Sequence, residues 1–155
     1  MEYVNQILTN RIIIAGLGAW VIAQILKLFI NLIVNRKLVW ERLFGDGGMP
    51  SGHSATVTSA ALMTGLWCGF DSPAFALAAI LAIVVMHDAM GVRLETGKQA
   101  KVINEMTEFL EKIGGKNLSD EEKLKEFVGH TPLQVGMGFL LGIGVALLVN
   151  YIFAG

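Results

Sequence analysis

Residues Ile12–Val34 read IIIAGLGAWVIAQILKLFINLIV, and Lys27 is the one charged residue in this stretch. At a rise of about 1.5 Å per residue, a helix of this length crosses the roughly 30 Å hydrocarbon core of a bilayer. The 155 residues are 54% hydrophobic and 16% charged, whereas an average soluble domain contains about 25% charged residues. We therefore expect an all-α integral membrane protein with a single membrane domain over residues 1–155.

Three further apolar runs follow the first. Together they predict about four transmembrane helices, over residues 12–34, 55–70, 73–90 and 132–154. The second and third runs are short and only Asp71 and Ser72 separate them, so a partly re-entrant hairpin is the alternative. In the fourth run, the spacing of Gly138 and Gly142 lets two helix backbones approach closely, within one protomer or between protomers. Four spans make a thin bundle, so we also expect a homodimer.

Lysine and arginine are distributed unevenly around these spans. The first loop, residues 35–54, and the third, about 93–130, hold all of them outside the spans except Arg11. The positive-inside rule therefore predicts that both loops are cytoplasmic. In the third loop, apolar residues recur at helical spacing between Val102 and Ile113, which predicts a cytoplasmic amphipathic helical insertion.

Other features narrow the location and the partners. The first residues lack the basic segment of a signal peptide, so we expect a retained first helix and a bacterial cytoplasmic (inner) membrane. No basic patch alternates with aromatic residues, so nucleic acid is not an expected partner, whereas the lipid bilayer is. The single cysteine, Cys68, excludes an intrachain disulfide and a cysteine-rich metal site.

The stretch GGMPSGHSA, from Gly47 to Ala55, precedes the second span. Glycines let a backbone approach a ligand, and the start of a helix offers N–H groups to an anion. His53 could donate a proton to a leaving oxygen at near-neutral pH. The alternative is an ordinary turn that caps a membrane helix.

Further polar residues are expected at the cytoplasmic ends of the other spans. In the first span, a polar stripe favours an inward-facing anion site, with snorkelling of its lysine as the alternative; its members are Gln24, Lys27, Asn31 and Asn35. His130 and Gln134 are one helical turn apart at the start of the fourth span, so they can project the same way.

A charged segment follows the third span. Arg93 and Lys98 could bind phosphate, or could pair with the carboxylates of Asp88 and Glu95. Two carboxylates make a thin cation site, so no metal is expected there. Asp88, Glu95 and Gln134 are expected to position the binding side chains without touching phosphate.

These segments resemble a known family. Pro50-Ser51-Gly52-His53 is similar to the second signature of the type 2 phosphatidic acid phosphatase superfamily, which includes the vanadium haloperoxidases. The segment that begins at His130 is similar to the end of its third signature. The succession of GGMPSGHSATVT, HDAMGVRLETGKQA and GHTPLQV resembles the divergent bacterial and plastid branch more closely.

The resemblance implies a membrane phosphatase that hydrolyses a lipid phosphate or diphosphate at the cytoplasmic face, without metal or cofactor. His130 would attack phosphorus and form a phosphohistidine, and His53 would protonate the leaving oxygen. Ser51 and the Gly52 N–H would hold phosphate oxygens, and Lys27 would neutralise their charge.

Two positions depart from the superfamily pattern. Gln134 stands where an aspartate normally orients the nucleophilic histidine, and Leu124 stands where an arginine is expected. An amide accepts a hydrogen bond but does not stabilise an imidazolium by charge. The alternative is therefore a protein that binds or transports a lipid phosphate or another anion without cleaving it.

Overall fold

The computed structural model describes residues 1–36, 48–114, 124 and 129–154, and their regular secondary structure is entirely helical. The helices are α1 (Glu2–Leu8), α2 (Arg11–Asn35), α3 (Gly52–Cys68), α4 (Pro73–Met90), α5 (Val92–Lys112) and α6 (Pro132–Ala154). The predicted all-α membrane architecture is confirmed. α3 begins three residues before its predicted span because the Ser51 hydroxyl caps it, accepting from the Ser54 N–H at 3.3 Å.

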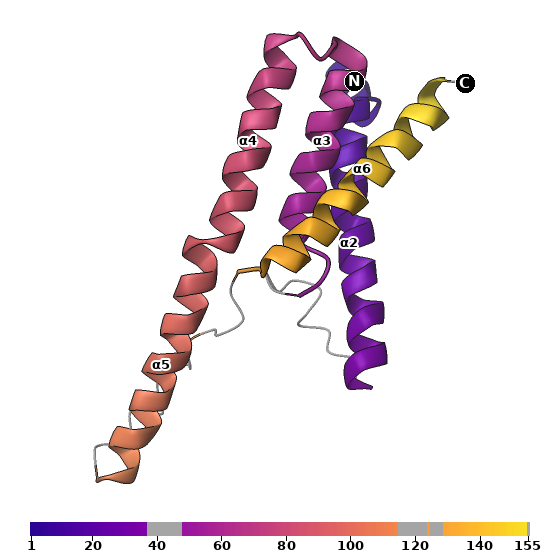
Figure 1. The fold of residues 1–155 in the computed structure, drawn as a ribbon. Helices are drawn as coiled ribbons and strands as arrows, with labels where there is room; N and C mark the ends of the chain where they lie inside the picture. The colour runs from indigo at the N-terminus through magenta and orange to yellow at the C-terminus, as the bar shows by residue number, and fades with distance from the viewer. Residues whose placement is uncertain (37–47, 115–123, 125–128, 155) are drawn as a thin grey trace.

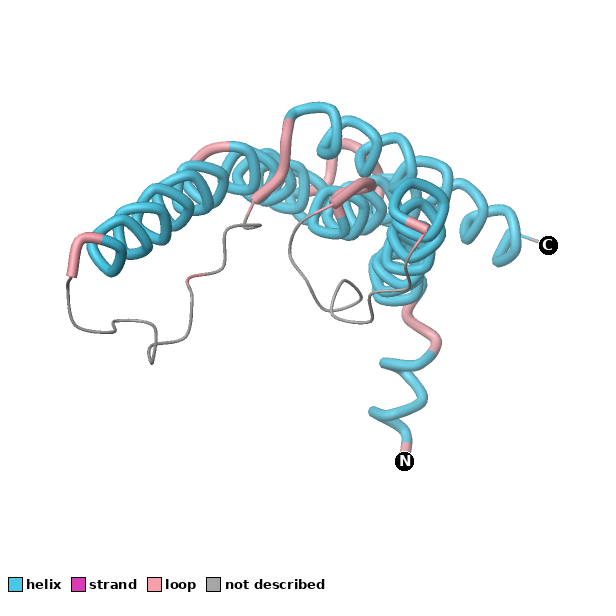
Figure 2. Tube along the Cα trace, turned by 90° about the horizontal axis from the view of Figure 1, so that it is seen from below, coloured by secondary structure: helices cyan, strands magenta, loops and turns pink. Residues whose placement is uncertain are grey.

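The long helices form a bundle around α3. Figure 1 shows α2 and α4 running in one direction and α3 and α6 in the other, with both chain ends at the same end of the bundle. α3 packs against α2, α4 and α6. Figure 2 shows α1, which the sequence did not predict, projecting sideways from the bundle.

Small residues let these helices approach closely. On α6, a Cβ on Gly138 would overlap the Ser51 carbonyl oxygen, and one on Gly142 would lie 2.6 Å from the Ala55 carbonyl oxygen. The glycine pair therefore packs α6 against α3 inside the protomer, which settles the alternative that the sequence left open. The homodimer stays a prediction.

Buried hydroxyls connect α3 to its neighbours. The Ser54 hydroxyl donates to the Val135 carbonyl of α6 at 2.8 Å, and the Ser59 hydroxyl donates to the Ala15 carbonyl of α2 at 3.0 Å. Hydrogen bonds of this kind between membrane helices contribute about 0.6 kcal/mol on average, so they set the register more than they stabilise. The start of α3 is thereby held between α2 and α6.

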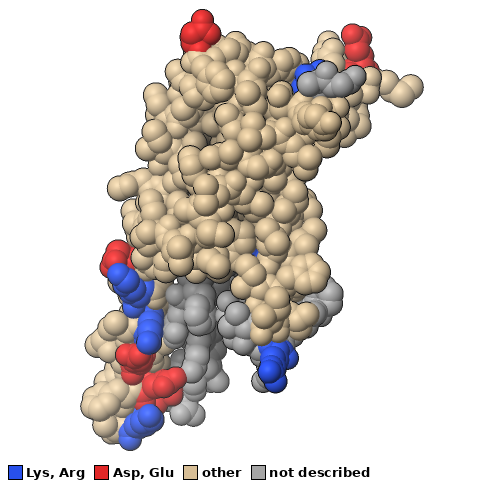
Figure 3. All heavy atoms as spheres, turned by 45° about the vertical axis from the view of Figure 1, so that its right-hand side comes forward, with Lys and Arg blue, Asp and Glu red and all other residues tan. Residues whose placement is uncertain are grey.

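The distribution of apolar and charged residues fits a membrane protein. Among the described residues, three segments are long and apolar enough to cross a membrane: Arg11–Ile33, Pro73–Lys112 and Pro132–Phe153. α3 has only 17 residues, so the fourth crossing stays a prediction, although α3 runs as one continuous helix. Figure 3 shows the described charges of one face at the two ends of the molecule, with an uncharged band between them.

The predicted insertion begins as a continuation of α4. Gly91 separates α4 from α5, and α5 ends just before Gly114, which has a positive φ of 96°. The apolar residues between Val102 and Ile113 that predicted this helix are mostly exposed. Apart from Leu124, Gly129 and His130, the rest of the insertion lies outside the described residues.

Candidate functional site

Two histidines meet where α3 and α6 begin. The ring centroids of His53 and His130 lie 5.8 Å apart, with an interplanar angle of 62°. His53 is the second residue of α3, and His130 lies two residues before α6, with only 1% of its surface exposed. The His130 N–H donates to the Ala89 carbonyl at 2.9 Å, which fixes this histidine to the end of α4.

Gly129 allows His130 to occupy this position. Its φ is +88°, and a Cβ on Gly129 would overlap the backbone of Arg93 and Leu94 at the start of α5. Only glycine combines that conformation with so close an approach. The chain entering α6 is therefore packed directly against the junction of α4 and α5.

Lys27 reaches the same region from α2. It is buried, with 7% of its surface exposed, on the face that also buries Asn31. Its Nζ lies 3.8 Å from the point that a Cβ on Gly52 would occupy, and its Cδ lies 3.9 Å from the corresponding point on Gly48. The lysine side chain thus runs along the glycine-containing segment and ends at the start of α3.

The start of α3 presents backbone donors beside this lysine. Ser51 is fully buried; its carbonyl accepts from the Ala55 N–H and its hydroxyl from the Ser54 N–H. Among the described residues, the Gly52 N–H has no acceptor within the chain. The N-terminus of a helix carries roughly half a positive charge. An ammonium placed beside it is unfavourable unless an anion lies between them, so the arrangement suits an anion.

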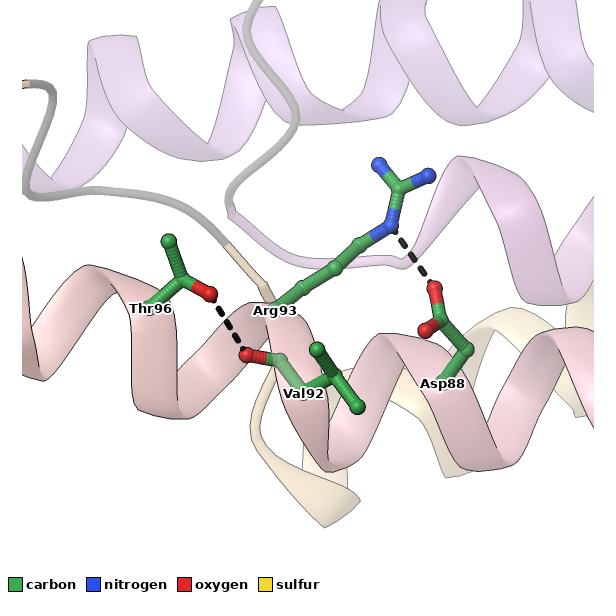
Figure 4. Close-up of polar contacts among 4 residues, drawn as sticks. All are labelled: Asp88, Val92, Arg93 and Thr96. Carbon is green, nitrogen blue, oxygen red and sulfur yellow. Dashed lines mark hydrogen bonds and ion pairs between the residues drawn. The ribbon is translucent and has the colours of Figure 1, made fainter.

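The charged segment after α4 divides into two pairs. Arg93 Nε lies 2.9 Å from Asp88 Oδ2, and Figure 4 shows these side chains pointing toward each other while the terminal guanidinium nitrogens point away from α5. Lys98 Nζ lies 2.7 Å from Glu95 Oε1, and both side chains are exposed. Because the Arg93 backbone packs against Gly129, Arg93 lies close to the segment that carries His130. Lys98 and Glu95 form a surface pair, the second of the two interpretations the sequence allowed.

Comparison with known proteins identifies the family of this chain. The model of the divergent PAP2 family matches residues 8–145. The chain belongs to the divergent PAP2 family. It is similar to the uncharacterized membrane protein YuiD of Bacillus subtilis (strain 168), with 39% identity over 156 residues, covering 96% of this chain and 99% of that protein. No solved structure matched.

In this divergent PAP2 protein, the Gln134 side chain bonds to the backbone at the start of α6. Its side-chain oxygen accepts from the Thr131 N–H at 3.0 Å, and the Thr131 hydroxyl accepts from the Gln134 N–H at 3.4 Å. This reciprocal pair is a capping box at the start of α6. The amide oxygen is thus used by the helix end, and the expectation that Gln134 positions the binding side chains stays a prediction. The Gln134 carbonyl also accepts from the Ser51 N–H at 2.9 Å, which joins α6 to the start of α3.

Sequence analysis missed one residue at the site. The indole of Trp20 approaches Gly52 as closely as Lys27 does, with Trp20 Cδ1 3.5 Å from the position of a Gly52 Cβ. Trp20 is seven residues before Lys27, which puts both side chains on one face of α2. That spacing was the available signal, but tryptophan within an apolar span is also an ordinary lipid-facing residue.

Possible metal ligands are not grouped in the part of the chain that the structure describes. Within the described ranges, no group of three or more His, Cys, Asp or Glu side chains is placed to hold a metal ion.

Leu124 is held by Asn104 of α5, whose side-chain amide donates to the Leu124 carbonyl at 2.9 Å and accepts from its N–H at 3.1 Å. The side chain of Asn35 lies outside the described part of the chain.

Proposed function

We propose that this divergent PAP2 protein is a phosphatase of the bacterial inner membrane that hydrolyses a lipid phosphate or diphosphate at the cytoplasmic face. One observation carries the proposal: the Lys27 ammonium and the start of α3 converge where His53 and His130 meet. The family match supports it, and so does the position of the site beside the two loops that hold most of the lysines and arginines.

The site supplies the charges that phosphoryl transfer requires. A phosphate bound at Gly52 would accept hydrogen bonds from the Gly52 N–H, the Ser51 hydroxyl and the Lys27 ammonium. Donors fixed before the reaction stabilise the charge that develops on the phosphate oxygens, most strongly in a buried site. Arg93, beside Gly129, would add a further positive charge from the side of α5.

The histidines would carry the chemistry. A ring nitrogen of His130 attacks phosphorus while the bond to the leaving oxygen breaks, and His53 gives that oxygen its proton. Water then attacks the phosphohistidine, His53 takes a proton from the water, and free phosphate leaves. Both rings lie close enough to contact one phosphate group.

A second candidate function is binding or transport of a phosphate-bearing ligand without hydrolysis. The capping box favours it, because Gln134 is turned to the helix end and no carboxylate occupies that position. Loss of an orienting carboxylate reduces turnover by several powers of ten in other histidine-dependent sites. The two functions share the anion site and differ in whether bound ligand is cleaved.

Lys27→Met tests the anion site. We expect it to weaken inhibition or binding by vanadate, a mimic of pentacoordinate phosphorus, by about 10- to 100-fold, because a charge-assisted hydrogen bond is lost. Purified protein would be titrated with vanadate, and phosphate release from a panel of lipid phosphates and diphosphates would be measured. Lys98→Met is the matched control. It should change neither the vanadate affinity nor the rate of phosphate release by more than about twofold, since the exposed ion pair of Lys98 contributes little. Unchanged vanadate affinity in Lys27→Met contradicts the proposal.

Gly52→Ala tests the position of the ligand. The added methyl group would lie in ordinary contact with Trp20 and Lys27, so the fold should be kept. It would fill the space between the ammonium and the start of α3, and we expect vanadate binding about tenfold weaker. Gly16→Ala is the control, because its methyl group meets Ala60 Cβ at a similar 3.5 Å on the α2–α3 contact. Equal affinity in both variants would place the ligand elsewhere.

A further inference from the structure

We propose that Trp20 is a specificity-determining residue that selects phosphates attached to a hydrocarbon chain over free phosphate. The inference rests on the proposed function, since it requires a phosphate at Gly52. Trp20 would contact the first carbons of the chain and take no part in the chemistry.

The geometry places the indole and the ammonium close to one point. Trp20 Nε1 and Lys27 Nζ each lie 3.8 Å from the position of a Gly52 Cβ, and Trp20 Cδ1 lies 3.5 Å from it. A phosphate held by Lys27 and the Gly52 N–H therefore has the indole as its neighbour. Whatever is attached to that phosphate on this side must pass Trp20.

The depth of Trp20 indicates what that attached group is. α2 runs from Arg11 toward Asn35, so the Trp20 backbone lies about 10 Å farther from the Asn35 end of the helix than the Lys27 backbone does, close to the middle of the apolar span. Trp20 is 41% exposed and lies within a segment long and apolar enough to cross a membrane, so its exposed side would meet hydrocarbon. A chain that leaves the phosphate toward the bilayer would lie along the indole, whereas a small polar group would leave toward Arg36 without meeting it.

Gln24 continues this face of α2. It lies between Trp20 and Lys27 on the same face of α2, at steps of four and three residues. Its Oε1 is buried and accepts no hydrogen bond from the described residues. A buried acceptor costs free energy unless a donor reaches it. Along this face the side chains change from cationic to amide to aromatic, the order of polarity in a lipid phosphate from head to chain.

The test compares ligands that differ only in chain length. Purified full-length protein in detergent would be titrated with inorganic phosphate and with n-alkyl phosphates of four to ten carbons, each in competition with vanadate. Wild-type affinity should rise severalfold per added methylene over the first carbons, as apolar surface is buried. Trp20→Ala should lose about tenfold for octyl phosphate and keep its affinity for inorganic phosphate within about twofold, because only the chain contact is removed. Trp20→Phe should retain most of the affinity that the alkyl chain adds.

Controls make the outcome decisive. Phe29→Ala removes an exposed aromatic side chain from the opposite face of α2 and should change the affinity for neither ligand. Partition of the alkyl phosphates into detergent is measured in samples that contain detergent without protein. If Trp20→Ala does not fold, Trp20→Leu provides the same comparison. Equal losses for inorganic and octyl phosphate, or wild-type affinity independent of chain length, overturn the inference and leave the proposed function intact. Failure of the wild type to bind phosphate or vanadate overturns both.

Discussion

His130→Ala is expected to reduce phosphate release by at least about 10³-fold, since removal of an enzyme's nucleophile commonly costs that much or more. The substitution deletes the group that would form the phosphohistidine and leaves Lys27, Ser51 and Gly52 in place. Release of phosphate from the best substrate of the panel would be measured with saturating substrate. Vanadate binding should persist, weakened by less than the turnover.

His87→Ala is the matched control for this result. His87 is an exposed histidine in the last turn of α4, outside the histidine pair, and its loss should leave turnover unchanged. Turnover that survives in His130→Ala contradicts the mechanism. Binding without turnover in the wild type, abolished by Lys27→Met, would instead identify the non-hydrolytic function that the Gln134 capping box favours.

Gly138→Ala is expected to destabilise the protein by about 1–3 kcal/mol or more, because it overpacks the contact between α3 and α6. The new Cβ would overlap the Ser51 carbonyl oxygen and lie 2.9 Å from Ser54 Cβ, both at the start of α3. Backbone atoms cannot turn aside as a flexible side chain can, so the helices must separate. Thermal unfolding in detergent would measure the loss.

Gly136→Ala on the same helix is the control, because no atom lies within 4 Å of its new Cβ. It should be neutral or slightly stabilising, since alanine favours a helix over glycine by up to about 1 kcal/mol. Equal unfolding temperatures for the two variants would show that α6 does not pack on Ser51 as described. The same contact carries the site, so a folded Gly138→Ala protein should also bind vanadate more weakly.

The candidate site was only partly predictable from the sequence. The glycine-containing segment before α3 indicated an anion site through its composition, and the polar stripe indicated an inward-facing Lys27. Both signals are local, because they depend on residues within a few helical turns. The role of Gln134 was not predictable, since the choice between the helix end and the His130 ring depends on how the chain enters α6. Trp20 gave no signal of its own, since an aromatic residue in a membrane span has many ordinary uses.

The sequence by itself determined that this chain is a helical membrane protein and approximately where each long helix runs, because hydrophobic run length and capping residues are local properties. Tertiary structure decided which of those segments meet. It packed Gly138 and Gly142 onto α3 inside the protomer, brought Lys27 to Gly52, and separated Arg93 from Lys98 by pairing each with its own carboxylate. The physical reason is that close packing between helices depends on the shape of both surfaces at once, and a sequence displays each surface only separately.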